Sequence, residues 1–456
     1  MQRDPLRLWV VKNIHTLAFL GSYFLTVVAG NLIFASPLAG DSLRISHSSG
    51  RFLEYPQTFT LGYWALLLCP FVLTPLIVAA TRRASRPWVG RVAGMLPEFR
   101  RVDYALICVA VFGFVIYRFW QADVVTLLST GVDFKSSVEA RFAIRARIGF
   151  ITLAPLQALL PFLTLYALIR WIQKGELFWM ALAVMNTFLL SVLLIMINMK
   201  WPVLLFYVGI VLAIFVYARK HAYVKTAVGA VLVFIAFIVI SAFVFRIAPS
   251  LDLDRAGAES RPVQASEYFV ATGKAVPSYV PNLLVIALNR MAISYPYYYQ
   301  VFTQEGPLCG GILGQATRDP ICRPSELIYS RIFVDDAFQN RGTSPLSVHI
   351  SGYALGGWPV AMLALFAGSI ILGLFAAVPL DRAPATGTAT IIGAQTAYHL
   401  SQIPGEGIIF YEHGLIWIAL MMIGYVLWRR LASSPKTGII ANTPTDYVEN
   451  WTKASR

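Results

Sequence analysis

The chain has 456 residues, of which 57% are hydrophobic and only 13% are charged, and its mean hydropathy is +0.64. Soluble domains are roughly 25% charged, so this composition leaves too little polar surface to face water and excludes a soluble protein. The net charge of +14 would suggest nucleic acid binding in a soluble chain. In a membrane protein, an excess of Arg and Lys is first a topology signal, so no nucleic acid partner is expected.

Apolar stretches of about 17 to 25 residues predict helices that cross a bilayer. Ten such stretches predict an all-α, polytopic membrane protein with about ten transmembrane helices and one large periplasmic loop. The stretches are 17–38, 58–80, 103–121, 150–170, 177–197, 201–218, 226–246, 357–379, 387–403 and 408–428.

The same stretches divide the chain into four regions. We expect a seven-helix membrane region over 1–246, a loop or cap over 247–356, a three-helix membrane region over 357–428 and a tail over 429–456. The loop contains nine basic and nine acidic residues, a balance that favours a folded cap over a disordered tail.

Part of this cap is apolar. Residues 281–301 predict a helix that lies at the membrane interface or dips into the cavity, with Asn289 and Arg290 on its polar side. The tyrosines of its YPYYY stretch fit either stacking on sugar rings or an aromatic belt at the membrane surface.

The distribution of basic residues predicts the orientation. With the amino terminus inside, 20 of the 37 basic residues lie on the inner side, and eight lie in short outer segments. The remaining nine lie in the long loop, and loops of that length do not follow the positive-inside rule. We therefore expect both termini to be cytoplasmic.

The outer loop 122–149 breaks this charge rule. Arg141 and Arg145 are four residues apart and would share one face of a helix, and Arg147 follows within the same two turns. Arginines on the side that is otherwise poor in them suggest an anion site, because the guanidinium fork matches phosphate or pyrophosphate. Contacts with lipid headgroups or with neighbouring acidic residues are the alternative.

The stretch SPLSVHISGYALGGW, residues 344–358, leads from the long loop into the eighth span. A histidine at the boundary of water and lipid can act as a general base near neutral pH, which makes His349 a catalytic candidate. The nearby glycines allow close approach of a substrate or of another helix, and Tyr353 is a further candidate for substrate binding. The alternative for His349 is a histidine hydrogen-bonded to backbone.

A His followed by an aromatic residue and then by glycines that open a membrane helix, after a large outer loop, resembles the O-antigen ligase and polymerase group. The whole layout is similar to Wzy-type polysaccharide polymerases, although in motif the resemblance covers only residues 344–358. An Arg-x10-Gly pattern described for two periplasmic loops of such polymerases occurs at Arg246 to Gly257 and at Arg331 to Gly342. Here both matches fall in one loop.

The resemblance implies a metal-independent glycosyltransferase of the bacterial inner membrane that needs no cofactor. It would move a growing glycan from undecaprenyl pyrophosphate to a hydroxyl of the next lipid-linked repeat unit, and a chain-length regulator protein is a partner to consider. Arg246 and Arg290 could converge on the same anion as the three arginines of the earlier loop, and snorkelling of each side chain to the membrane interface is the alternative. As general base, His349 ranks ahead of Glu412, His413 and His399.

The last two spans carry further polar residues. Gln395, His399 and Gln402 recur on one face of the ninth span, and such groups at membrane depth usually face a cavity. Hydrogen bonds between helices are the alternative. Two other functions remain open: an O-antigen ligase, which uses lipid A core as acceptor, and a flippase or exporter of lipid-linked oligosaccharide.

The cysteines do not form a metal-binding pattern. Cys309 and Cys322 lie in the outer loop and predict a disulfide, because the periplasm is oxidising and closing a loop of about 14 residues stabilises by roughly 3 kcal/mol. Cys69 and Cys108 lie within spans and are expected to stay reduced. Mass spectrometry of the purified chain distinguishes free from paired thiols.

Overall fold

The computed structural model describes residues 4–36, 51–129, 134–218, 221–243, 288, 292–311, 323–332, 342–379, 384–402 and 415–432. Helices make up the secondary structure of these residues, and no β-strand occurs among them. The chain divides into two compact units, Met1–Ile418 and Ala419–Arg456, and the contacts described below lie within the first.

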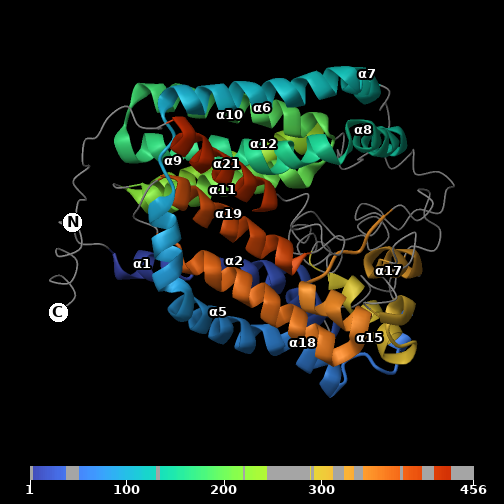
Figure 1. Ribbon diagram of the computed structural model, residues 1–456. Coiled ribbons are helices and arrows are strands. Elements are labelled where there is room, and N and C mark those ends of the chain that lie inside the picture. Colours follow the sequence, from blue (N-terminus) through green and yellow to red (C-terminus); the bar gives the residue numbers. More distant parts are fainter. Residues whose placement is uncertain are drawn as a thin grey trace, which may run out of the picture. The chain divides into compact units, whose positions relative to one another are not determined.

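The amino-terminal helices are α1 (Pro5–Lys12), α2 (Ile14–Tyr23), η1 (Phe24–Val28), α3 (Ala29–Phe34), η3 (Arg51–Glu54), α5 (Leu61–Met95), α6 (Arg101–Gln121), α7 (Val124–Ser129), α8 (Phe134–Ala154), η4 (Pro155–Leu159), α9 (Leu160–Lys174), α10 (Leu177–Met196), α11 (Lys200–Tyr217) and α12 (Ala222–Phe243). They are followed by α15 (Ser294–Gln304), η7 (Leu308–Gly310), α17 (Pro324–Ile332), α18 (Val348–Ala377), α19 (Pro384–Ser401) and α21 (Leu415–Ala432). Figure 1 labels most of these helices along the chain.

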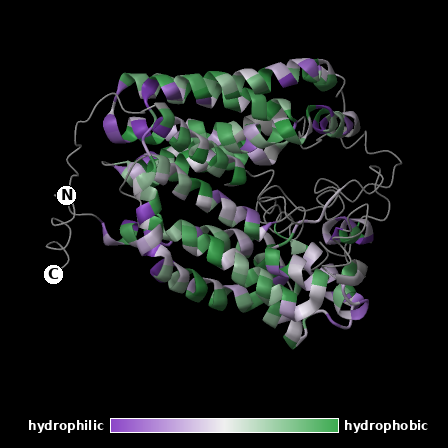
Figure 2. Cartoon of the chain, viewed as in Figure 1, coloured by the Kyte–Doolittle hydropathy of each residue, from purple (hydrophilic) through white to green (hydrophobic). Residues whose placement is uncertain are grey.

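The helices present a broad apolar surface. Val109 on α6 is 71% exposed, and Val184 and Phe188 on α10 are exposed as well. Figure 2 shows long hydrophobic stretches along the helices, with hydrophilic residues mostly towards their ends. Soluble proteins rarely expose apolar surface on this scale, so the chain is a multi-pass α-helical membrane protein.

Six of the ten expected spans are confirmed as helices long and apolar enough to cross a bilayer, counted over the described residues. These are Ile14–Phe34, Leu61–Met95, Arg101–Gln121, Glu139–Lys174, Leu177–Met196 and Val348–Ala377. The expected sixth and seventh spans correspond to shorter apolar helices, Trp201–Tyr217 and Ala222–Ala236.

The last two expected spans differ from the helices found. The ninth corresponds to α19, which has 18 residues and does not meet the hydropathy of a span. The tenth corresponds to α21, which begins at Leu415, later than the expected residue 408. A total of about ten spans therefore stays a prediction.

Helix α5 is longer than a membrane is thick. Its 35 residues extend over about 52 Å at 1.5 Å per residue, against a hydrocarbon core of about 30 Å. Between the expected spans 58–80 and 103–121, residues 82–101 are expected to form a cytoplasmic loop, and this is wrong for most of the segment, because the helix runs on through Arg82, Arg86 and Arg91 to Met95. Its Ala and Arg residues are good helix formers, and they offset the helix-breaking Pro87.

Close contacts between small residues hold α18 against α5. A Cβ atom on Gly373 would lie 2.5 Å from the Thr81 Cβ atom, so the two backbones approach as only glycine permits. The Ser369 hydroxyl donates to the Thr74 hydroxyl at 3.3 Å. Small residues and buried hydroxyls are typical of contacts between membrane helices. Helix α19 packs against α2, α9, α11 and α18.

An arginine of helix α1 caps the carboxy-terminal end of α11. The Arg7 guanidinium donates to the backbone carbonyls of Phe215, Val216 and Ala218 at 2.7 to 3.1 Å. These carbonyls lack helical donors because α11 ends there. The Tyr223 hydroxyl donates to the Asp4 side chain, and this bond lowers the pKa of the Asp4 carboxyl.

Helix α18 is a hairpin of two antiparallel legs. Gly356 (φ −175°) and Gly357 (φ 65°) interrupt it, and the second φ lies in the left-handed region that favours glycine. A Cβ atom on Gly352 would lie 2.8 Å from the Val360 carbonyl oxygen, whereas residues eight apart on a straight helix are about 12 Å apart. The chain therefore turns back, and the leg Val348–Leu355 packs against the leg Trp358–Ala377 (Figure 1).

The described part of the expected cap packs onto α3 and α5. The tyrosines at 295, 297 and 298 on α15 are fully buried, and the Tyr295 hydroxyl donates to the Tyr63 carbonyl of α5 at 2.5 Å. The Asn31 amide of α3 donates to the Ala292 carbonyl at 3.3 Å. These tyrosines form a packed core, which explains them better than sugar stacking or a membrane-surface belt.

Candidate functional site

The three candidate arginines of the early outer loop share one helix. Arg141, Arg145 and Arg147 all lie on α8, which confirms the helical spacing assumed for them. The Arg141 Cζ atom lies 5.3 Å from the centroid of the Phe142 ring, and Arg145 and the Tyr329 phenol of α17 are within electrostatic range of Arg141. Arg141 and Arg145 are half-buried and Arg147 is exposed.

A glycine separates these arginines from the membrane span that follows. Gly149 has φ 65° and ψ 174°, a region that is essentially restricted to glycine. The arginine-bearing segment 134–148 is thus a helix of its own, and the apolar helix resumes at Phe150. This helix passes through η4, a single π-helical turn of the kind often found at functional sites.

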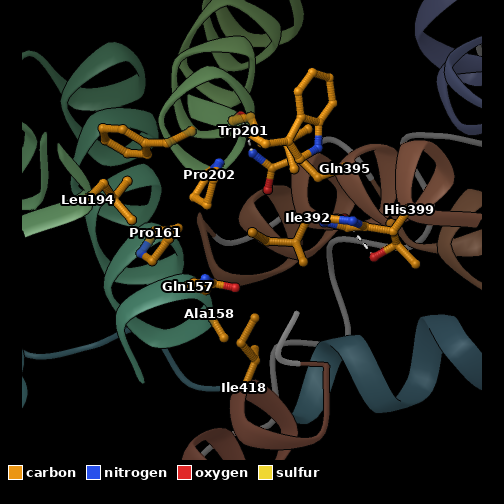
Figure 3. A pocket seen from close by; sticks show the side chains of 13 residues that line it. Gln157, Ala158, Pro161, Leu194, Trp201, Pro202, Ile392, Gln395, His399 and Ile418 are labelled. Carbon is orange, nitrogen blue, oxygen red and sulfur yellow. Dashed lines mark hydrogen bonds between the residues drawn. The ribbon is translucent and has the colours of Figure 1, made fainter. Parts of the chain in front are cut away.

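A small cavity, mostly apolar but lined by four polar side chains, begins at Gln157, eight residues beyond this junction. Its volume is about 40 Å³, enough for a few water molecules. Figure 3 shows Gln157 and Ala158 of η4 on one side and Ile392 and Gln395 of α19 on the other. His399, one turn further along α19, lines it as well.

Gln395 ties two walls of this cavity together. Its side-chain amide donates to the Leu205 carbonyl of α11 at 2.7 Å. A Cβ atom on Gly209 would lie 2.5 Å from that amide nitrogen, so glycine makes the approach possible. The Trp201 and Tyr398 rings pack with their centroids 4.3 Å apart. The interhelical hydrogen bond expected as an alternative for Gln395 is therefore present, and the same side chain faces the cavity.

His349 lies away from this cavity, in the middle of the helix bundle. Its side chain is 0% exposed. Its Nε2 atom is 3.2 Å from the Leu66 carbonyl oxygen and 3.4 Å from the Tyr23 hydroxyl. Its Nδ1 atom is 3.0 Å from the Ser347 hydroxyl. Both ring nitrogens are thus engaged by protein groups.

His349 contacts α5 at a backbone carbonyl that lacks its usual helical donor. In a helix the Leu66 carbonyl would accept from the amide four residues later, but that residue is Pro70, which has no N–H. An imidazole Nε2–H supplies a donor in its place, and the Ser347 hydroxyl that lies beside Nδ1 donates to the Leu400 carbonyl at 3.3 Å. These surroundings favour a structural role for His349 over that of general base.

Tyr353 also serves packing. Its hydroxyl is 2.9 Å from the Thr303 hydroxyl, and its ring is stacked on Tyr299, with centroids 5.7 Å apart. It thereby joins the first leg of α18 to α15. Neither Tyr353 nor His349 lines the cavity beside α19.

Several predicted residues lie outside the described part of the chain. These are Arg246, Arg290, Glu412, His413 and Cys322, as is the side chain of Cys309. Of the two Arg-x10-Gly matches, only the second is described, and there the Arg331 guanidinium pairs with the Glu305 carboxylate at 3.2 Å. Cys69 and Cys108 are free, as expected.

Two residues of the cavity were missed in the sequence. Gln157 was hidden inside an otherwise apolar span, where a glutamine is itself a signal of a cavity or an interhelical contact. Trp201 stands at the start of α11 and reads as an interface aromatic. Only the spatial arrangement brings the two together.

The described residues contain no group of three or more His, Cys, Asp or Glu side chains that could hold a metal ion. Comparisons with known proteins found no matching family model, no matching curated protein and no matching solved structure.

Proposed function

We propose that this protein is a polysaccharide polymerase of the bacterial inner membrane. It transfers a growing glycan from undecaprenyl pyrophosphate to a lipid-linked repeat unit. The observation that carries the proposal is the junction at Gly149, where a helix bearing three arginines leads within ten residues into the wall of a cavity lined by Gln157, Gln395 and His399 among apolar side chains. The resemblance to Wzy-type polymerases implies that the anion bound by these arginines is the pyrophosphate of a lipid-linked glycan.

In the proposed reaction, the oxygen of an acceptor sugar hydroxyl attacks the anomeric carbon of the growing glycan. The bond between that carbon and the pyrophosphate oxygen breaks, and the pyrophosphate leaves with the electron pair. Arg141, Arg145 and Arg147 stabilise the charge that develops on it, since guanidinium groups bind phosphate oxygens bidentately. A general base takes the proton of the hydroxyl.

The base is sought first among His399, Glu412 and His413. His399 lines the cavity, and the other two belong to the segment that follows α19. His349 contributes by holding the first leg of α18 against α5. In the proposed orientation both termini are cytoplasmic, the cap is periplasmic and a chain-length regulator binds from that side.

The test is elongation of a synthetic lipid-linked repeat unit by the purified chain in proteoliposomes, read as a ladder of products. Arg145→Ala should lower the rate by about 100-fold or more, the typical cost of one donor to a developing negative charge. Arg145→Lys should recover little, because it offers a point charge in place of a fork. Arg86→Ala, an exposed arginine of α5, is the matched control and should elongate normally.

Three outcomes would contradict the proposal. Full activity after all three arginines of α8 are changed to alanine would remove their role. Movement of the lipid-linked unit across the bilayer without any elongation would identify a flippase. Transfer to lipid A core, in preference to a second repeat unit, would identify a ligase.

A further inference from the structure

A second site lies at the carboxy-terminal end of α9, whereas the arginines of α8 precede the amino-terminal end of α9. An open cleft of about 620 Å³ is bounded there by the end of α9 and the starts of α6 and α10. This volume lies within the range of pockets that hold ligands. Its basic lining residues are Arg100, Arg101 and Arg170, and we call it the basic cleft.

Two buried donors in the lining of the basic cleft lack an acceptor. The Arg170 Nε and the Trp179 Nε1 have no hydrogen-bond partner, although Arg170 is only 8% exposed and Trp179 only 1%. Unsatisfied buried donors are rare in proteins and call for a water or a ligand. Two N–H groups beside one open cleft point to a ligand with acceptor oxygens.

An aromatic floor holds these donors in place. The Arg170 Cζ atom lies 5.6 Å from the Trp179 ring, which packs against Tyr104 and Tyr166 with centroids 5.1 and 5.8 Å apart. The Phe99 amide donates to the Tyr166 hydroxyl at 2.9 Å. The site is therefore fixed by packing before any ligand arrives.

The charges around the basic cleft favour an anion by a small margin. Glu98 pairs with Arg170 and lies 3.9 Å from Lys174, and Glu176 pairs with Arg101 at 2.9 Å. Asp103 is the third carboxylate, so four cations face three anions when Arg100 is included. The Arg101 pair is exposed, and such pairs contribute little and open readily.

The position of the basic cleft favours a lipid over a soluble anion. It lies where apolar helices begin and end, so its charges belong at the boundary of water and lipid. Beneath it, apolar side chains such as Val102 and Leu106 of α6 and Leu177 of α10 are exposed and would face acyl chains. Basic pockets at this depth between membrane helices are suited to anionic headgroups.

We propose that the basic cleft binds the headgroup phosphate of an anionic phospholipid. Arg170 and Trp179 donate to its oxygens, and Arg101 exchanges part of its contact with Glu176 for the lipid. The site is independent of glycan transfer, so its test stands apart from the test of the proposed function.

The experiment is native mass spectrometry of the full chain in neutral detergent, titrated with phosphatidylglycerol or phosphatidylcholine. The wild type should bind the anionic lipid about tenfold more tightly or better, and Arg170→Gln should abolish that preference, since a charge-assisted bond is lost. Trp179→Phe keeps the ring and removes only the N–H, and it should weaken the anionic lipid about fivefold. Arg86→Gln, an exposed arginine of α5, should change nothing.

The melting temperature of each variant in phosphatidylcholine nanodiscs serves as the folding control, and Trp179→Phe gives a second route if Arg170→Gln does not fold. Equal binding of the two lipids by the wild type would overturn the proposal. So would full anionic preference in Trp179→Phe and Arg170→Gln together. Displacement of the lipid by millimolar inorganic phosphate would assign the site to a free anion and overturn the lipid as its ligand.

Discussion

The imidazole of His349 occupies a place that the backbone of α5 creates. Pro70 removes the helical donor of the Leu66 carbonyl, and the Nε2 atom of His349 lies 3.2 Å from that oxygen. The neighbouring Leu67 carbonyl accepts from the Tyr23 hydroxyl at 2.9 Å. Two side chains from distant parts of the sequence thus donate to adjacent carbonyls in one buried turn of α5.

His349→Ala should therefore reduce the free energy of unfolding by about 1 to 3 kcal/mol, because the buried Leu66 carbonyl would keep only the weak thiol donor of Cys69. The measurement is the melting temperature of the purified chain in detergent. Ser351→Ala, on the same leg of α18, is the matched control, because its buried hydroxyl has no partner and its removal should cost nothing. An unchanged melting temperature with turnover lowered about 100-fold would restore His349 as the general base.

At the scale of elements, glycines decide where helices break. Residues 344–358 predicted close approach around the GYALGG glycines, and the contact between Gly352 and Val360 is of that kind. The reversal itself could not be predicted, because a straight apolar helix and a hairpin of the same residues have the same composition and periodicity. The same holds at Gly149, where the helical spacing of the arginines was predicted and the change of direction was not.

Gly352→Ala should destabilise α18, because the new Cβ atom would lie 2.8 Å from the Val360 carbonyl oxygen and 3.1 Å from the Ala361 Cα atom. Overpacking of this kind costs about 1 to 3 kcal/mol. The readout is thermal unfolding in detergent. Gly113→Ala in α6 has no atom within 4 Å of its new Cβ, so it should be neutral or gain up to about 1 kcal/mol from helix propensity. Equal effects of the two changes would argue against the packed hairpin.

At the scale of the whole molecule, composition was enough to predict a helical membrane protein, and hydropathy found the helices that face lipid. The helix expected over 387–403 exists as α19, but it is less apolar than a span, and its threonines at 386, 388, 390 and 396 are buried. Three of them donate back to the carbonyls four residues earlier. A helix enclosed by α2, α9 and α11 does not need apolar residues, so a lipid-based scale underestimates it. Gln157 and Gln395 line the same cavity, but they are too far apart in the sequence for any local pattern to predict it.

The orientation predicted from the basic residues can be tested across the membrane. Single substitutions Arg86→Cys on α5 and Arg147→Cys on α8, both exposed positions, should react with a membrane-impermeant maleimide from opposite sides. In intact spheroplasts only residue 147 should be labelled, because the positive-inside rule assigns α5's basic end to the cytoplasm. Mass spectrometry of the labelled peptide separates each site from the native cysteines. Labelling of both from one side would refute the predicted orientation.

The hairpin of α18 also sets an order of assembly during synthesis. His349 follows its partner Leu66 by 283 residues, and at roughly 5 to 20 residues per second the ribosome needs about 15 to 60 s to make that stretch. Throughout this time α5 stands in the bilayer with the Leu66 carbonyl held only by the Cys69 thiol, at 3.4 Å. The leg Val348–Leu355 is too short to insert alone, since eight residues reach about 12 Å. We expect it to insert only when it folds against its partner leg. Until then the amino-terminal helices lack their contacts with α18. Insertion factors that shield polar groups in lipid are expected to act mainly during this interval.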